Sequence, residues 1–237
     1  MVSTLELTCE YRRSHRALDS VTLRAEPGTI VAVLGGPRSG KTTLVRAFMG
    51  RVKPRSGSCL IGACVCAKDF IGTRQIATFV DREMSLYRGL SPRRNVEIFA
   101  LLAGVSVDSE SVEQALRRVG VAERYIDRPL TSIDTEISPL VWLALAVVRN
   151  TPAVILDEPM RDCSVHTAGF VGETLEDLRR DGRSILFTTE DLSATRLATR
   201  VVILNAGRKV AELTPAELLD QNVTDFLSLF SRRSPSE

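Results

Sequence analysis

The sequence predicts an α/β domain with a largely parallel core sheet, a small antiparallel β layer and an inserted helical lobe. Two observations support this fold class. Short apolar runs alternate with segments of helical spacing, and a glycine-rich loop joins the first run to the first helical segment. With 237 residues, of which 44% are hydrophobic, the chain can bury one large core, whereas two unrelated domains would be cramped.

The parallel core is predicted from three apolar runs, at residues 30–34, 153–156 and 184–188. Residues 41–49 have helical spacing directly after the first run, and residues 168–180 have it between the second and the third. Strands that alternate with helices are typical of βαβ units, in which neighbouring strands run parallel. We therefore expect these three strands to lie in one sheet.

The helical lobe is predicted at about residues 82–149. Within it, residues 92–103, 109–119 and 139–149 have apolar residues at helical spacing and begin with Ser or Pro, which favour helix starts. Because this segment lies between two predicted core strands, we expect it to form an insertion in the core domain.

The two ends of the chain are predicted to pack around this core. Apolar residues alternate with polar ones near the N-terminus, which predicts a small antiparallel layer. The alternating positions are Leu5, Leu7, Val21 and Leu23. Residues 201–204 and 208–213 predict a closing hairpin around the turn at 205–207. We expect residues 1–220 to form the domain and residues 221–237 a C-terminal helix and tail.

Composition narrows the classes of function. The formal net charge is only +2, with 25% charged residues, so the sequence predicts no nucleic-acid partner. The five cysteines lack metal-ligand spacing and are odd in number, which favours a reducing compartment. The longest apolar run, residues 140–148, is far shorter than the roughly 20 residues that a spanning helix needs. We expect no transmembrane segment.

The glycine-rich loop has the pattern Gly35-x-x-x-x-Gly40-Lys41-Thr42, known as Walker A. Backbone N–H groups of such a loop, together with the positive end of the following helix, attract phosphate oxygens. Lys41 is expected to bridge the β- and γ-phosphates of a nucleotide, and Thr42 to offer its hydroxyl to Mg²⁺. The alternative is a glycine turn that merely joins strand to helix. The residues expected around the phosphates are Gly35, Gly36, Pro37, Arg38, Ser39, Gly40, Lys41, Thr42 and Thr43.

The apolar run at 153–156 is followed by Asp157 and Glu158, which is the Walker B arrangement of P-loop nucleotidases. Asp157 is expected to hold Mg²⁺ through water. Glu158 is expected to polarise an attacking water as the general base of hydrolysis. Two acids after a strand can also simply begin a surface loop, but the phosphate loop upstream favours the nucleotide site.

From residue 5 to about residue 219, the order of these motifs resembles the ATP-binding subunits of ABC transporters. Tyr11 matches the family's aromatic position that stacks on adenine. Residues 86–91 are similar to the loop before the helical lobe in drug- and polysaccharide-export members. The resemblance implies a P-loop NTPase fold and a site that binds ATP and Mg²⁺.

The resemblance also implies partners and a location. A chain of this kind is expected to couple ATP binding, with or without hydrolysis, to transport through a separate transmembrane permease subunit of an exporter. It pairs with a second ATPase subunit, which we expect to make a heterodimer, although a homodimer stays open. The expected location is peripheral, on the cytoplasmic face of the cell membrane.

Several positions depart from the family pattern. The glycine-rich signature falls on residues 134–138, which read Asp-Thr-Glu-Ile-Ser. Residues 130–134 are a weaker alternative register, and neither register restores the motif. The switch histidine falls on Glu190, the Q-loop glutamine on Asp81 and the D-loop aspartate on Ser164. Arg38 occupies a Walker A position that the family reserves for glycine, where it could strain the turn or add a phosphate contact. These departures predict impaired hydrolysis. The alternative function is a catalytically impaired nucleotide-binding module that regulates or stabilises a complex.

Overall fold

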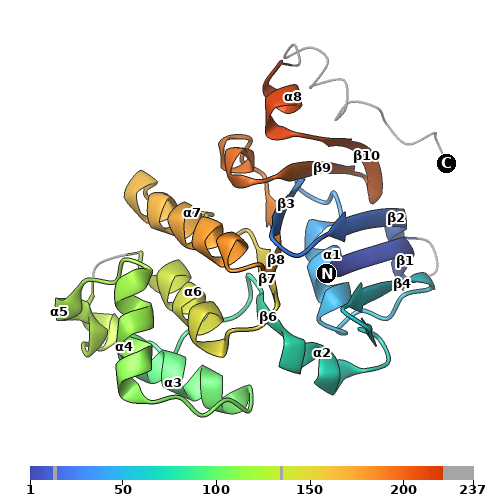
Figure 1. Ribbon diagram of the computed structural model, residues 1–237. Coiled ribbons are helices and arrows are strands. Elements are labelled where there is room, and N and C mark those ends of the chain that lie inside the picture. Colours follow the sequence, from blue (N-terminus) through green and yellow to red (C-terminus); the bar gives the residue numbers. More distant parts are fainter. Residues whose placement is uncertain (13–14, 134–135, 221–237) are drawn as a thin grey trace.

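The computed structural model describes residues 1–12, 15–133 and 136–220, which form two sheets and a group of helices (Figure 1). The first two positions of the predicted signature, 134–135, lie outside the described residues, as do the C-terminal helix and tail predicted at 221–237.

The predicted core sheet is confirmed as a six-stranded sheet in the order β10-β9-β3-β8-β7-β6. Only the β9–β10 pairing is antiparallel. All residues of β7 and β8 are buried, because helices and the second sheet cover both faces, and this explains their unbroken apolar runs. The strands are β3 (Thr29–Leu34), β6 (Ala77–Val80), β7 (Ala153–Asp157), β8 (Ser184–Thr189), β9 (Arg200–Asn205) and β10 (Arg208–Leu213).

The antiparallel layer has the strand order β2-β1-β4-β5. The expected alternation along β1 is wrong at Leu5, whose side chain is 60% exposed. The register of β1 shifts between Thr4 and Leu7 against β2 and between Leu5 and Thr8 against β4, and Glu6 takes a φ of 46° in this bulge. The bulge turns Leu7 into the core and Leu5 outward. The strands are β1 (Val2–Arg12), β2 (His15–Ala25), β4 (Ser56–Ile61) and β5 (Cys64–Val65).

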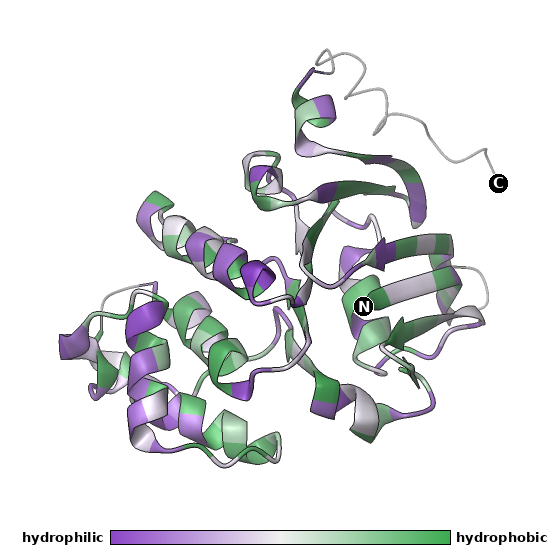
Figure 2. Ribbon diagram, viewed as in Figure 1, coloured by the Kyte–Doolittle hydropathy of each residue, from purple (hydrophilic) through white to green (hydrophobic). Residues whose placement is uncertain are grey.

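The helices of the insertion gather beyond the β6 edge of the core sheet (Figure 1). Among them α6 is the most apolar, as Figure 2 shows, because it packs against α3 and α4 on one side and α7 on another. The helices predicted at 41–49, 92–103, 109–119, 139–149 and 168–180 are confirmed, whereas α2, α5 and α8 were not predicted. The helices are α1 (Lys41–Phe48), α2 (Phe70–Ile76), α3 (Pro92–Leu102), α4 (Ser109–Arg118), α5 (Glu123–Ile126), α6 (Ser138–Arg149), α7 (Val165–Arg180) and α8 (Pro215–Asp220).

None of the helices in the described parts of the chain combines the length and the apolar character needed to cross a bilayer.

The loop at 86–91 is held to the helical lobe by a buried amide. Asn95, on the first turn of α3, is fully buried. Its Oδ1 accepts a hydrogen bond from Tyr87 N at 2.7 Å, and its Nδ2 donates to Tyr87 O at 3.1 Å and Ser91 O at 3.0 Å. A buried amide with satisfied partners fixes the loop, because any replacement leaves backbone groups without partners.

Asn95→Ala should therefore lower the free energy of unfolding by about 1–3 kcal/mol, the cost of leaving buried polar groups unpaired. Leu101→Ala is the matched control on the same helix, since Leu101 is 70% exposed. Its effect should stay within about 0.5 kcal/mol. Urea unfolding of both variants measures the difference. Equal effects would contradict the role given to Asn95.

Candidate nucleotide-binding site

The phosphate loop runs from the end of β3 to the start of α1. Gly40 has a φ of 104°, and a Cβ there would lie 2.5 Å from Ala17 O. A Cβ at Gly35 would lie 2.5 Å from Leu204 O. Only glycine fits these two positions, because a larger side chain would collide with backbone that cannot move cheaply.

The start of α1 faces the same loop. No side chain caps this helix at Gly40, and the first α-helical hydrogen bond runs from Leu44 N to Gly40 O. The N–H groups of the first turn before Leu44 therefore have no acceptor within the helix. Such free N–H groups and the positive end of the helix dipole make this an anion-binding position.

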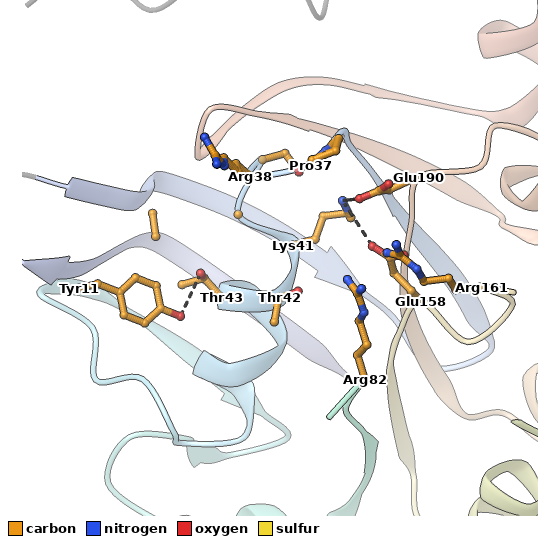
Figure 3. A pocket seen from close by; sticks show the side chains of 13 residues that line it. Tyr11, Pro37, Arg38, Lys41, Thr42, Thr43, Arg82, Glu158, Arg161 and Glu190 are labelled. Carbon is orange, nitrogen blue, oxygen red and sulfur yellow. Dashed lines mark hydrogen bonds and ion pairs between the residues drawn. The ribbon is translucent and has the colours of Figure 1, made fainter. Parts of the chain in front are cut away.

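Arg38 takes a φ of 61°, so a non-glycine residue does adopt the left-handed conformation at this position of the loop. Its side chain is exposed and extends away from Lys41 (Figure 3). The loop thus accepts the backbone strain that the sequence suggested. Arg38 lines the outer part of the cavity beside the loop.

Lys41 is the buried cation of the site, with a residue exposure of 4%. Its Nζ donates to Gly35 O at 2.8 Å, to Gly36 O at 3.0 Å and to Glu190 Oε1 at 3.3 Å. Glu158 Oε1 lies 3.6 Å away as a second ionic partner. Since an ammonium group has three donors, all three are engaged.

The Walker B acids differ in their surroundings. Asp157 is 3% exposed, and its Oδ1 accepts a hydrogen bond from Thr188 Oγ1 at 2.5 Å. Its Oδ2 is buried and has no hydrogen-bond partner among the described residues. An unpartnered carboxylate oxygen near the hydroxyl-bearing loop suits Mg²⁺, which commonly takes one or two protein ligands and completes its shell with phosphates and water.

Glu158 has a φ of 52°, a sparsely populated conformation for a residue with a side chain. Its N–H donates to Thr188 Oγ1 at 3.0 Å. Its Oε2 accepts from Arg161 Nη1 at 2.9 Å, while Oε1 faces Lys41. This hydrogen bond raises the pKa of Arg161. Both carboxylate oxygens of the expected general base are thus paired with cations.

A cavity of about 370 Å³ opens over the loop. Tyr11 stands at its rim, 51% exposed, with its hydroxyl 3.2 Å from Thr43 Oγ1 (Figure 3). Of the predicted site residues, Gly35, Gly36 and Asp157 do not line this cavity, although Lys41 contacts the first two. The lining residues are Tyr11, Ala17, Pro37, Arg38, Ser39, Gly40, Lys41, Thr42, Thr43, Arg82, Glu158, Arg161 and Glu190.

Two arginines of the cavity were not predicted as site residues. Arg82 follows the Q-loop position, and its side chain extends toward Glu158 (Figure 3). Arg161 lies three residues after Glu158, a spacing that could have pointed to the pair. With Arg38 and Lys41, they give the lining more positive than negative side chains, which favours a polyanionic ligand.

The other departures from the family pattern have local partners. Asp81 is 1% exposed, accepts from Arg51 Nη1 at 2.6 Å and lines a second cavity instead of the phosphate cavity. Ser164 is the N-cap of α7, and its hydroxyl accepts from Thr167 N at 3.2 Å. Glu136, from the signature segment, accepts a hydrogen bond from Ser164 N. The segments expected to correspond to the signature and the D-loop are therefore tied together.

Gly40→Ala should destabilise the protein by about 1–3 kcal/mol, because it combines a positive φ with a collision against backbone. Gly36→Ala is the matched control, since a Cβ at Gly36 meets nothing within 4 Å. Its effect should remain within about 0.5 kcal/mol. Urea unfolding without nucleotide measures both variants, and a tolerated Gly40→Ala would show that the loop adopts another conformation.

Comparison with known proteins connects this site to a family. The family model for ABC transporters matches residues 18–161. The chain is 28% identical over 206 residues to the macrolide export ATP-binding/permease protein MacB 2 of Yersinia pestis bv. Antiqua (strain Antiqua). The aligned region covers 83% of this chain and 30% of that protein. The chain is 26% identical over 209 residues to the Nod factor export ATP-binding protein I of Mesorhizobium japonicum, covering 87% and 61%.

Solved structures agree in fold. A bacterial ABC transporter cassette solved as a dimer superposes with a TM-score of 0.81 at 21% identity, covering 91% of this chain and 99% of that one. An ATP-binding subunit of an ABC transporter superposes with a TM-score of 0.83 at 22% identity, covering 97% and 99%. The family model spans more than half of the chain, and the chain therefore belongs to the ABC transporter family, with the fold of its ATP-binding cassettes.

Proposed function

We propose that this chain binds Mg-ATP at the phosphate loop and serves as the ATP-binding subunit of an ABC exporter. The observation that carries the proposal is the buried ammonium group of Lys41, which lies beside an uncapped helix N-terminus and opposite the Walker B acids. The nine residues from Gly35 to Thr43 would surround the phosphates. Tyr11 would stack on the adenine, since its ring stands half-exposed at the cavity rim.

Thr42 and Asp157 would hold Mg²⁺, which when bound neutralises part of the phosphate charge. The chain's own contribution to hydrolysis would come from Glu158. To accept a proton from water, this carboxylate must first leave Arg161 and Lys41, which hold its two oxygens. The approach of a triphosphate supplies a competing anion for both cations.

We propose that hydrolysis by this subunit alone is slow. Glu190 puts a carboxylate where a γ-phosphate donor is expected, and the signature segment brings acids instead of glycine N–H groups. The working form would then pair this chain with a second, more active ATPase subunit. A heterodimer fits these departures better than a homodimer, in which both sites would carry them.

A membrane partner would dock in a groove of about 520 Å³ near the Asp81 loop, between α2 and the helical lobe. Phe70, Ile71 and Leu102 offer exposed apolar side chains there, at 48%, 71% and 70% exposure. Burial and the neighbouring Arg74 lower the pKa of Arg149 in the same groove. A permease segment with apolar side chains and a carboxylate would complement it. Docking there would hold the chain on the cytoplasmic face of the membrane.

The direction of transport is proposed from the relatives, several of which are named as export proteins. The macrolide export relatives are named as joined ATP-binding and permease proteins, and this chain spans 30% of the length of the one described above.

A non-catalytic nucleotide-binding module is the second candidate function. The ion pairs that hold Glu158 and Lys41 favour it, because they must all break before hydrolysis. In that case ATP would tighten a complex, and Glu158 would not act as a base.

Lys41→Ala should abolish the calorimetric heat and the melting shift produced by Mg-ATP, because the loop loses its only buried cation for the phosphates among the described residues. Lys53→Ala is the matched control, since Lys53 is exposed and does not line the cavity. It should bind Mg-ATP like the wild type. The proposal would be contradicted if Mg-ATP produced no calorimetric heat with the wild type, or the same heat with Lys41→Ala as with the wild type.

ATPase rates separate the two candidate functions. If Glu158 is the general base, Glu158→Gln should lower the rate of hydrolysis by about 10²-fold or more. Glu190→His should raise it, because a donor replaces an anion beside Lys41. Unchanged rates in both variants would support the non-catalytic module. Hydrolysis by the purified wild type at ordinary transporter rates, with no partner, would contradict the need for a second subunit.

A further inference from the structure

The space in front of Lys41 is already filled by a carboxylate. Two of its three donors go to the backbone of the loop itself, and the third goes to Glu190 at 3.3 Å. The lysine of such a loop reaches the β- and γ-phosphates of a bound nucleotide. Glu190 therefore lies at the position where the terminal phosphate of a triphosphate would meet Nζ.

The backbone keeps Glu190 next to the loop. It follows directly on β8, whose last residue, Thr189, accepts a hydrogen bond from Gly35 N at 3.2 Å. Thr189 also pairs in register with Leu34 of β3. On the other side, Asp191 N donates to Thr189 Oγ1 at 2.9 Å and closes a tight turn. The Glu190 side chain can rotate, but its Cα cannot move away from the phosphate loop without breaking these contacts.

The two glutamates of the site are not equivalent. Glu158 has Arg161 as a second cation at 2.9 Å. For Glu190, Lys41 is the only ion-pair partner within 4.0 Å in the described parts of the chain. A γ-phosphate that takes Lys41 from Glu190 thus leaves a 37% exposed carboxylate beside new negative charge. A diphosphate ends before that position and leaves the pair in place.

We propose that Glu190 acts as a built-in substitute for the γ-phosphate. Compared with an ordinary phosphate loop, this site therefore favours nucleoside diphosphates over nucleoside triphosphates. The inference rests on the proposed binding of nucleotide at this cavity and defines its ligand more closely. A subunit of this kind keeps a diphosphate bound while its partner subunit turns over. Its occupancy then follows the supply of diphosphate and not the cycle of hydrolysis.

Calorimetric titration with Mg-ADP and Mg-ATP tests the proposal. The wild type should bind Mg-ADP at least as tightly as Mg-ATP. Glu190→Gln keeps the shape but removes the charge, so it should tighten Mg-ATP binding about tenfold or more, since tenfold is the scale of one typical charge contact. Binding of Mg-ADP should change by less than about threefold, because the β-phosphate would lie farther from Glu190 than the γ-phosphate of Mg-ATP and would interact with its charge more weakly. Unaltered Mg-ADP binding also shows that the variant is folded.

Asp162→Asn is the matched control, since it removes one negative charge from a side chain that is 91% exposed near Arg161. It should leave the ratio of the two affinities unchanged. A wild type that prefers Mg-ATP by tenfold or more, with the same ratio in Glu190→Gln, would overturn the selectivity while leaving the proposed function intact. Equal tightening of both nucleotides in Glu190→Gln would also overturn it. Failure of both nucleotides to bind the wild type would instead refute the proposed function.

Discussion

The parallel pairing of β3, β7 and β8 is the constraint on which the rest of the site depends. Leu34 lies beside Thr189, and Asp157 lies beside Thr188, so the carboxyl ends of all three strands meet at one edge of the sheet. Segments more than 100 residues apart in sequence are thereby brought to the two sides of Lys41. Since ligands of open α/β sheets bind outside the carboxyl ends of the strands, the site follows from the topology.

The ion pairs at this edge of the sheet then determine which anionic ligands it can bind. Lys41, Glu158, Glu190 and Arg161 form one connected set of ion pairs, in which each charge has a partner. Buried charges are tolerated only when they are paired in this way. The same pairing means that a triphosphate enters by exchange, because its γ-phosphate must replace a carboxylate on Lys41. Differences among phosphate ligands then depend on which carboxylate each of them displaces.

The antiparallel layer and the helical lobe surround the core sheet and support the site from outside it. The antiparallel layer brings Tyr11 to the cavity rim and packs Ala17 and Leu18 against Gly40, so the loop is held from outside the core sheet. The helical lobe lies beyond β6 and leaves an apolar groove between α3 and α2. The Asp81 loop touches both places, because Asp81 accepts a hydrogen bond from Arg51 of the groove and its neighbour Arg82 lines the cavity over the phosphate loop.

Apolar periodicity and glycine spacing are local signals, and from them the fold class, the core strands β3, β7 and β8, the main lobe helices and the two phosphate-site motifs could be predicted. These signals did not predict β4, β5 and β6, the short helix α5, or the bulge that exposes Leu5. The sequence could not show that Arg51 holds Asp81 or that Glu190 contacts Lys41 across 149 residues. These two pairs follow from the three-dimensional arrangement, because the partners of a charge depend on which distant segments the fold brings together.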